Sequence, residues 1–521
     1  MEGILVIEPD GNPPVLFPSS NEFASMAQYR KYGFTIAACV LSLICACAYL
    51  FVPSLLIPAL LILMLLMPIL LWHYPRLAFY SVFAAVCLIE VFPTNQPDSI
   101  TDRLPFFLNV NTIVQTYTGK EFKAIPFSPL EIILVVAGCA SFLRGVFMKN
   151  LSLRRGPLFL PIFLYCCFVG YGWINGMLTG GDFKISLMEV RPQCYLLLAY
   201  LMAVNSLRDR RDVDRLLWSM AICIGVKGFL YTFRRYVTLA GVPISDQGVG
   251  SHEEAFLFSA YMIMLFLLTL LSVNKRLTRF MWTLSPFVVL GDLATNRRAG
   301  IGALVLGILL LMLAVDRASP HYRKRIRRIC FVILVCFLIY YPVFKSSNGA
   351  FAMPAHAISS MFTPDARDAA SNAYRDAENA DLMATIRLAP LQGYGYGKRM
   401  LHAVPIDDIS GQYEYWDVMT HNSILWVWMR LGTPGFFVFW IMVANLLIYI
   451  CGTIRSEHAD IYSQALGIYT LVLVSMLLVF ALLDLGLVNF RNMLFVGFWA
   501  GGLVVAATSD AKPLRDSEIS K

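Results

Sequence analysis

Long apolar runs constrain this chain more than any other feature of its sequence. About fourteen stretches are long and hydrophobic enough to cross a bilayer as helices, which takes about 17–25 residues each. A backbone inside lipid must satisfy its own polar groups, and a helix does so within a single segment. The predicted spans cover residues 34–52, 54–72, 77–93, 129–147, 157–178, 192–207, 213–233, 254–273, 280–295, 299–315, 328–344, 422–450, 460–482 and 485–507.

The composition places the chain among membrane proteins. Of its 521 residues, 58% are hydrophobic and only 15% are charged, whereas soluble proteins carry about 25% charged residues. The first 33 residues are polar and contain no short apolar segment that ends in a small-residue cleavage site, so we expect the first span to be an uncleaved anchor. We predict an all-α polytopic membrane protein with about fourteen transmembrane helices. The range is twelve to fourteen, because residues 94–128 can hide a re-entrant or interfacial helix.

Lysine and arginine predict the orientation of the spans. If the N-terminus is cytoplasmic, the basic loops lie on the cytoplasmic side, as the positive-inside rule requires. These basic residues are Arg144, Lys149, Arg154, Arg155, Arg208, Arg210, Arg211, Lys275, Arg276, Arg279, those of 321–328, and Arg455. An even number of spans then places both termini in the cytoplasm and the large loop on the outer face.

The chain is expected to divide at that loop. The predicted segments are a cytoplasmic N-terminal segment (1–33), N-terminal transmembrane helices (34–189), a transmembrane core (190–344), the large loop (345–420), C-terminal transmembrane helices (421–507) and a cytoplasmic tail (508–521). In the first segment, Asp10-Gly11 lies between two apolar runs and predicts a small β-hairpin.

The large loop contains helical, turn and polar parts. Thr363-Pro364 predicts a helix cap followed by proline at the first helical position, and the Ala-rich, charged stretch after it predicts one or two amphipathic helices ending at Pro390. The run Gly393–Gly397 lacks the Lys-Ser/Thr of a phosphate loop, so we expect a tight reversal. The acidic and aromatic remainder suits either sugar binding or a solvated loop at the membrane interface.

Charged side chains at the outer ends of spans are costly unless they are paired or used. Arg297 and Arg298 are adjacent at one such end, where they either extend to lipid headgroups or clamp a diphosphate with their planar donors. Arg191 starts another span and either pairs with Glu189 or binds substrate. Arg375, in the predicted loop helix, is either a surface charge paired with Asp376 or Glu378, or part of a site.

His421-Asn422 opens an apolar helix directly after the large loop. Imidazole exchanges a proton near neutral pH, so His421 is a candidate acid–base group as well as a candidate interfacial residue bonded to a carbonyl. His252, Glu253 and Glu254 cluster at the outer start of another span. They are candidates for holding an acceptor hydroxyl or orienting His421.

Two other classes of function are disfavoured. The net charge of +8 is explained by cytoplasmic basic loops and attraction to anionic lipids, and no basic segment interleaved with aromatics points to nucleic acid. All twelve cysteines fall in or beside apolar runs, so we expect packing residues and predict no disulfide framework and no metal site.

Over residues 190–450 the chain resembles the O-antigen ligase and Wzy-type polymerase superfamily of bacterial lipid-linked glycan enzymes. One family mark is a His-Asn that opens the span after a large periplasmic loop, and a second is an Arg upstream of a Pro-Leu-x-Gly-x-Gly turn. A third mark is Ser-Arg-small at the start of an earlier span, where Arg297 replaces the Ser and leaves open which arginine is functional. The matching residues are His421, Asn422, Leu425, Gly432, Arg375, Pro390, Leu391, Gly393, Gly395, Arg298 and Ala299. Three spans follow the loop, as in the family, whereas eleven precede it instead of the usual nine.

The resemblance implies a glycosyltransferase of the bacterial inner membrane that acts at the periplasmic face. The donor would be a glycan on undecaprenyl diphosphate and the acceptor a hydroxyl on a glycan, lipid or protein, with no cofactor and no metal. It implies catalytic His421, Arg375 and Arg298, with Arg297, Arg191, Asn422, Glu254 and His252 as candidates for substrate binding. A polysaccharide polymerase is the first expectation and a ligase to lipid A-core or protein the second. A transporter is the alternative of another class, but no repeated halves support it.

Overall fold

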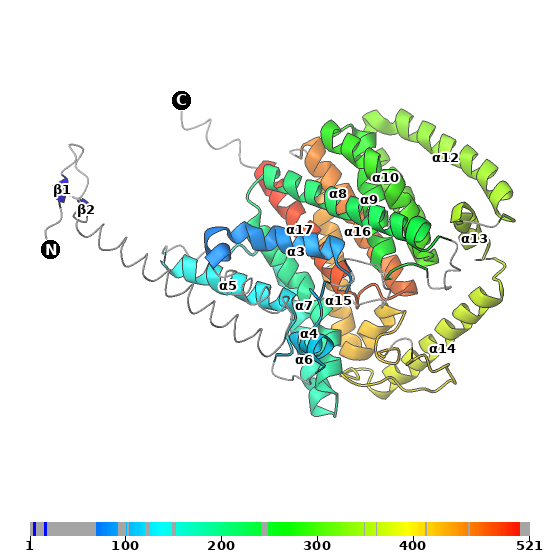
Figure 1. Cartoon of the computed structure of the whole chain (residues 1–521), viewed down its shortest axis with the longest axis horizontal. Helices are drawn as coiled ribbons and strands as arrows, with labels where there is room; N and C mark the ends of the chain where they lie inside the picture. Colours follow the sequence, from blue (N-terminus) through cyan, green and yellow to red (C-terminus); the bar gives the residue numbers. More distant parts are fainter. Residues whose placement is uncertain are drawn as a thin grey trace.

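The computed structural model describes residues 4–6, 15–17, 69–91, 101, 104–119, 125–147, 153–240, 248–251, 253–347, 350–360, 362–411, 414–456 and 459–510. Apart from one antiparallel pair of strands, β1 (Ile4–Val6) and β2 (Val15–Phe17), the regular elements in these residues are helices (Figure 1). The two strands agree with the predicted hairpin, whose turn at Asp10-Gly11 lies outside the described residues. Ten described helices are long and apolar enough to cross a membrane, which confirms an all-helical, multi-pass membrane protein.

Twelve of the predicted spans correspond to described helices, while the span 34–52 and most of 54–72 lie outside the described residues. These helices are α3 (Pro75–Leu88), α5 (Pro129–Phe147), α6 (Phe159–Leu178), α7 (Phe183–Ser206), α8 (Arg210–Phe233), α9 (Glu253–Leu271), α10 (Lys275–Thr295), α11 (Arg298–Ala318), α12 (Arg323–Phe344), α15 (Ser423–Arg455), α16 (Ile461–Leu483) and α17 (Phe490–Asp510). A π-helical turn, Arg234–Thr238, continues α8, and 3-10 turns occupy Pro320–Tyr322 and Ala350–Ala352. Only α3 and α10 fall outside the ten candidate spans.

Burial follows the distribution of apolar residues around each helix. Helix α9 is apolar on nearly all sides, as is typical of a helix inside a bundle, and it packs with α10, α11 and α16. Helix α17 packs along α7 and is also largely buried. By contrast, α12 is exposed along nearly its whole length and lies at the edge of the bundle (Figure 1). Its apolar surface is therefore available to lipid.

Helix α7 begins earlier than the predicted span 192–207. Asp182 caps it by accepting a hydrogen bond from the backbone N–H of Ile185 at 2.8 Å, and Pro192 lies inside the helix. The cap moves the start of the helix to Phe183, which includes the polar residues Glu189 and Arg191 in the helical segment. Hydropathy alone missed this extension because those two residues lower the apolar average.

Helix α15 contains a break. Gly432 has φ of +67°, a left-handed conformation that L-residues avoid, and Pro434 follows it. The break leaves a backbone N–H of α15 without a partner in its own helix. This N–H, on Thr433, donates to the carbonyl of Pro390 in the large loop at 2.8 Å. The break therefore forms a contact between the first part of α15 and the loop.

The large loop contains α13 (Met353–Ser359) and α14 (Ala366–Leu388), and a further short helix, α4 (Val110–Thr118), lies in the 94–128 region. Helix α14 ends before Pro390, as predicted, but its cap is Asp365 rather than Thr363. The Asp365 carboxylate accepts from the N–H of Asp368 at 2.7 Å, an N-cap bond that Thr363 stands too far upstream to make. We call the end of the bundle where α11 and α15 begin, and against which α14 lies, the loop face.

Candidate functional site

The Gly-rich turn after α14 fastens the large loop to the bundle. Gly393, Gly395 and Gly397 all have φ near +80°. Glu189 of α7 accepts a hydrogen bond from the N–H of Gly397 at 2.6 Å and pairs with Arg430 of α15 at 2.6 Å. Arg430 in turn donates to the carbonyl of Gly395 at 2.9 Å. The turn is thus a tight reversal, as the sequence predicted, and the buried Glu189–Arg430 ion pair that holds it was not predicted.

Arg191, predicted to bind substrate or pair with Glu189, lies in a buried, ion-paired environment. It pairs with Glu131 at 2.9 Å, rather than with Glu189, and donates to Asn109 at 2.8 Å and to the carbonyl of Pro126 at 2.5 Å. Only 5% of it is exposed. These contacts tie the segment before α5 to α7 and leave Arg191 no surface for a substrate.

His421 lies just before α15 and contacts α14. Its Nδ1 is 3.2 Å from both carboxylate oxygens of Glu378, and its backbone N–H donates to Oε2 of Glu378 at 3.0 Å. The Glu378 side chain is 1% exposed and that of His421 is 23% exposed. Burial disfavours the charged imidazole, but the hydrogen bond and negative charge of Glu378 outweigh it and raise the pKa of His421.

Asn422 is the N-cap of α15. Its side-chain oxygen accepts from the N–H of Leu425 at 3.1 Å, which satisfies one of the unpaired donors of the first helical turn. The described contact of this side chain is therefore structural, and it holds the start of α15 directly beside His421.

Three predicted arginines lie near one another at the loop face. Arg298 pairs with Asp368 of α14 at 2.8 Å and donates to Ser360 Oγ at 3.2 Å. Burial lowers the pKa of Arg297. The negative charges of Asp484 and Glu253 act in the opposite direction, whereas the positive charges of Arg367 and Arg375 lower the pKa further. The charge of Arg375 also acts on Arg298 and on His421.

Arg297 and Arg375 have spare hydrogen-bonding capacity. The Nε atom of each is buried and has no partner among the described residues. Arg375 makes no ion pair among the described residues, so the alternative in which it pairs with Asp376 or Glu378 is not seen, and Glu378 instead contacts His421. The arrangement combines concentrated positive charge with an imidazole, which suits binding of an anionic group beside a proton acceptor.

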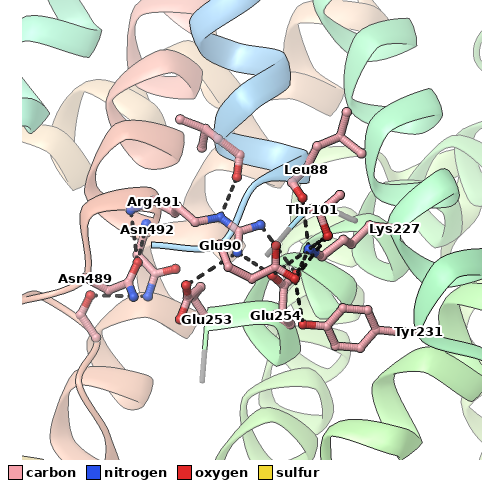
Figure 2. A network of polar contacts seen from close by, with 12 residues as sticks. Leu88, Glu90, Thr101, Lys227, Tyr231, Glu253, Glu254, Asn489, Arg491 and Asn492 are labelled. Atoms are coloured by element: carbon pink, nitrogen blue, oxygen red, sulfur yellow. Dashed lines mark hydrogen bonds and ion pairs between the residues drawn. The ribbon is translucent and has the colours of Figure 1, made fainter. Parts of the chain in front are cut away.

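Glu253 and Glu254 belong to a buried network near the loop-face ends of α8, α9 and α17 (Figure 2), and the charge of Glu253 also acts on Arg297. Glu254 is fully buried and pairs with Arg491 of α17 and, at 3.5 Å, with Lys227 of α8. Glu253 lies 3.4 Å from Arg491. Because its carboxylate is enclosed and used by these cations, Glu254 does not offer the predicted surface to an acceptor. His252 lies outside the described residues.

The sequence analysis did not identify Glu378 and Asp368 as site residues, nor Lys227 and Arg491 as network residues. Glu378 could have been found, because it lies three residues after Arg375 in a predicted helix and so on the same face. Asp368 offered no comparable signal, since it is one of several acidic residues in an exposed, charged stretch. Lys227 sits in an apolar span, where any cation signals a buried partner.

These features define a class: a multi-pass helical membrane protein with a charged, histidine-containing site where a large loop meets the ends of its spans. Residues 287–440 match the family model described as O-Antigen ligase. This match confirms the family resemblance over residues 287–440, a range that includes Arg297, Arg298, Arg375, Glu378 and His421. No curated protein matches the chain.

Proposed function

We propose that the chain is a glycosyltransferase that moves a glycan from undecaprenyl diphosphate to an acceptor hydroxyl, and that it acts as a polysaccharide polymerase. The observation that carries this proposal is His421, partly exposed and held by Glu378, beside Arg297, Arg298 and Arg375. The O-antigen ligase match supports the same chemistry, since its range contains all of these residues.

In the proposed reaction His421 acts on the attacking hydroxyl, and the arginines act on the leaving diphosphate. The acceptor oxygen attacks the anomeric carbon, and its proton passes to Nε2 of His421 acting as general base. The bond between the anomeric carbon and the diphosphate oxygen breaks, and its electron pair stays on the leaving diphosphate. Arg297, Arg298 and Arg375 stabilise that charge as it develops. Attack opposite the leaving group predicts inversion at the anomeric carbon.

We further propose that the loop face is periplasmic, in the inner membrane of a bacterium. Basic residues support this orientation, since Lys275, Arg276 and Arg279 begin α10 at the end of the bundle away from the large loop. The donor would then be reached from the outer leaflet, with lipid surrounding exposed helices such as α12.

The test is an assay of purified protein in lipid vesicles, with an undecaprenyl-diphosphate oligosaccharide and no other acceptor. A ladder of products that disappears in His421→Ala, with the variant still monodisperse, is the expected result. Normal turnover by His421→Ala would overturn the mechanism. If the intact protein gives no ladder but transfers glycan once lipid A-core or a protein acceptor is added, the enzyme is a ligase. Movement of glycan across the vesicle without any new bond would identify a transporter.

A further inference from the structure

Glu378 is the only carboxylate within the described residues whose oxygens contact the ring of His421. It comes from a different element, since Glu378 belongs to α14 in the large loop whereas His421 precedes α15 in the membrane bundle. Its contacts are with both Nδ1 and the backbone N–H of His421. A single side chain therefore fixes both the position and the ring orientation of the histidine.

The contact also selects a tautomer. A carboxylate only accepts hydrogen bonds, so Nδ1 of His421 must carry the proton that lies toward Glu378. In the neutral ring, Nε2 then holds the lone pair, and within the described part of the chain it has no hydrogen-bond partner. The ring is further held by the edge of Tyr374, with centroids 5.9 Å apart and planes at 83°. The geometry thus leaves one basic nitrogen free and directed away from Glu378.

We propose that Glu378 is a positioning residue for transfer: it holds His421 with Nε2 as the proton acceptor and stabilises the imidazolium formed during the reaction. This inference rests on the proposed function. It means that the base is assembled from two elements, because the loop helix supplies the orienting carboxylate and the bundle supplies the imidazole. Since Arg375 lies one turn before Glu378 on α14, the same helix brings a cation and the orienting group to the site together.

The test compares Glu378→Gln with two control variants on α14. Glutamine keeps the size of the side chain but loses its charge and offers an N–H donor where an acceptor is needed. Asp376→Asn changes an exposed carboxylate. Asp381→Asn changes a second buried carboxylate, which accepts from the N–H groups of Ala403 and Val404 at 2.8 Å and approaches His402, so it reports what structural damage alone does.

In the vesicle assay we expect Glu378→Gln to lower kcat by about 100-fold, within the range that a positioned general base contributes, while KM for the donor stays unchanged. Activity that needs neutral His421 rises with pH through the pKa of His421, which Glu378 holds above its usual value. Asp484 also raises this pKa and Arg375 lowers it, and both remain in the variant. Removal of the Glu378 charge therefore lowers the pKa of His421, so the acidic limb of the pH profile should move to lower pH. Asp376→Asn should match the wild type, and Asp381→Asn should lose thermal stability without moving the pH profile.

Two outcomes would overturn the inference: wild-type activity of a folded Glu378→Gln variant, or reduced activity with an unmoved pH profile. His421→Ala in the same assay separates this from failure of the proposed function. An inactive His421→Ala beside a normal Glu378→Gln would remove only Glu378, whereas an active His421→Ala would remove the base itself. If Glu378→Gln does not fold, Glu378→Asp provides the test, since its shorter carboxylate keeps the charge and should retain the wild-type pH limb with reduced kcat.

Discussion

Gly432 shows how one residue joins the large loop to a membrane span. An added Cβ there would lie 2.2 Å from the carbonyl oxygen of Leu391. On the other side of the contact, a Cβ on Gly393 would lie 2.5 Å from the nitrogen of Gly432. The Pro-Leu-x-Gly-x-Gly turn and the downstream glycine are the two family marks at this contact. Each can approach the other only because neither Gly393 nor Gly432 has a side chain.

We expect Gly432→Ala to destabilise the protein by about 2 kcal/mol or more, because it combines a strained positive φ with a backbone clash. Gly452 in the same helix is a matched control, since a Cβ there meets nothing within 4 Å. Gly452→Ala should be neutral or slightly stabilising. Thermal unfolding of both variants in detergent would measure the difference, and equal midpoints would contradict the role of the break.

Single residues were predictable where chemistry and location coincided. His421 stood out because a titratable ring began an apolar helix, and the arginines stood out because outer loops hold few cations. Asp368, the partner of Arg298, did not stand out, because its contact depends on how the loop helix α14 packs on the bundle. The partners of Arg191 and Glu254, which are Glu131 and Arg491, could not be predicted either, because they are distant in sequence.

Helix α14 contacts the starts of two membrane spans, α11 and α15, through its side chains. Asp368 in its first turn pairs with Arg298 at the start of α11, and Glu378 further along holds His421 before α15. The Asp368 carboxylate occupies guanidinium donors that, under the proposed function, a diphosphate would use. The donor must then replace Asp368, which makes this ion pair a competitor of binding.

Asp368→Asn should therefore lower KM for the lipid-linked donor, because a neutral amide competes less well for Arg298 than a carboxylate does. Arg298→Ala should raise the same constant. Donor titrations of the two variants in the vesicle assay would check the opposite signs. An increased KM in Asp368→Asn would show instead that Asp368 helps to position Arg298 for the donor.

Elements were predictable to different degrees. The ten described candidate spans follow hydropathy, because a helix in lipid must be largely apolar over a length that crosses the bilayer. The start of α7 and the cap of α14 were displaced, since caps depend on one hydrogen bond that several nearby polar residues can make. The short helices α4 and α13 gave no clear periodic signal in sequences this brief.

At the scale of the whole molecule, the network in Figure 2 connects the end of α3 to α8 and α17. Glu90, just after α3, pairs with Lys227, whose side chain is fully buried and also donates to the carbonyl of Leu88 at 2.9 Å. Arg491 reaches the carbonyl of Val86 at 2.6 Å. These contacts lie outside residues 287–440, the range of the O-antigen ligase match. The spans on either side of that range are therefore held together by buried charges of their own.

Removal of one member should leave an unpaired buried charge. We expect Lys227→Met to destabilise the protein by about 3–5 kcal/mol, and Glu90→Gln to recover part of that loss in the double variant, because it removes the carboxylate left alone. A double-mutant cycle on unfolding free energies would measure the coupling. Strictly additive effects would show that Lys227 and Glu90 do not depend on each other.

Because α14 is held at Asp368 and at Glu378, its length fixes a distance between two parts of the site. The stretch from Asp368 to Glu378 rises about 15 Å along the helix axis, and this length sets how far Arg298 stands from His421 along the loop face. One inserted residue between the anchors would rotate Glu378 by about 100°, away from the histidine, whereas a whole extra turn would restore the direction but lengthen the span by about 5 Å. Only length changes of a whole turn in α14 would therefore keep Glu378 facing His421, and even these would change the distance between His421 and Arg298.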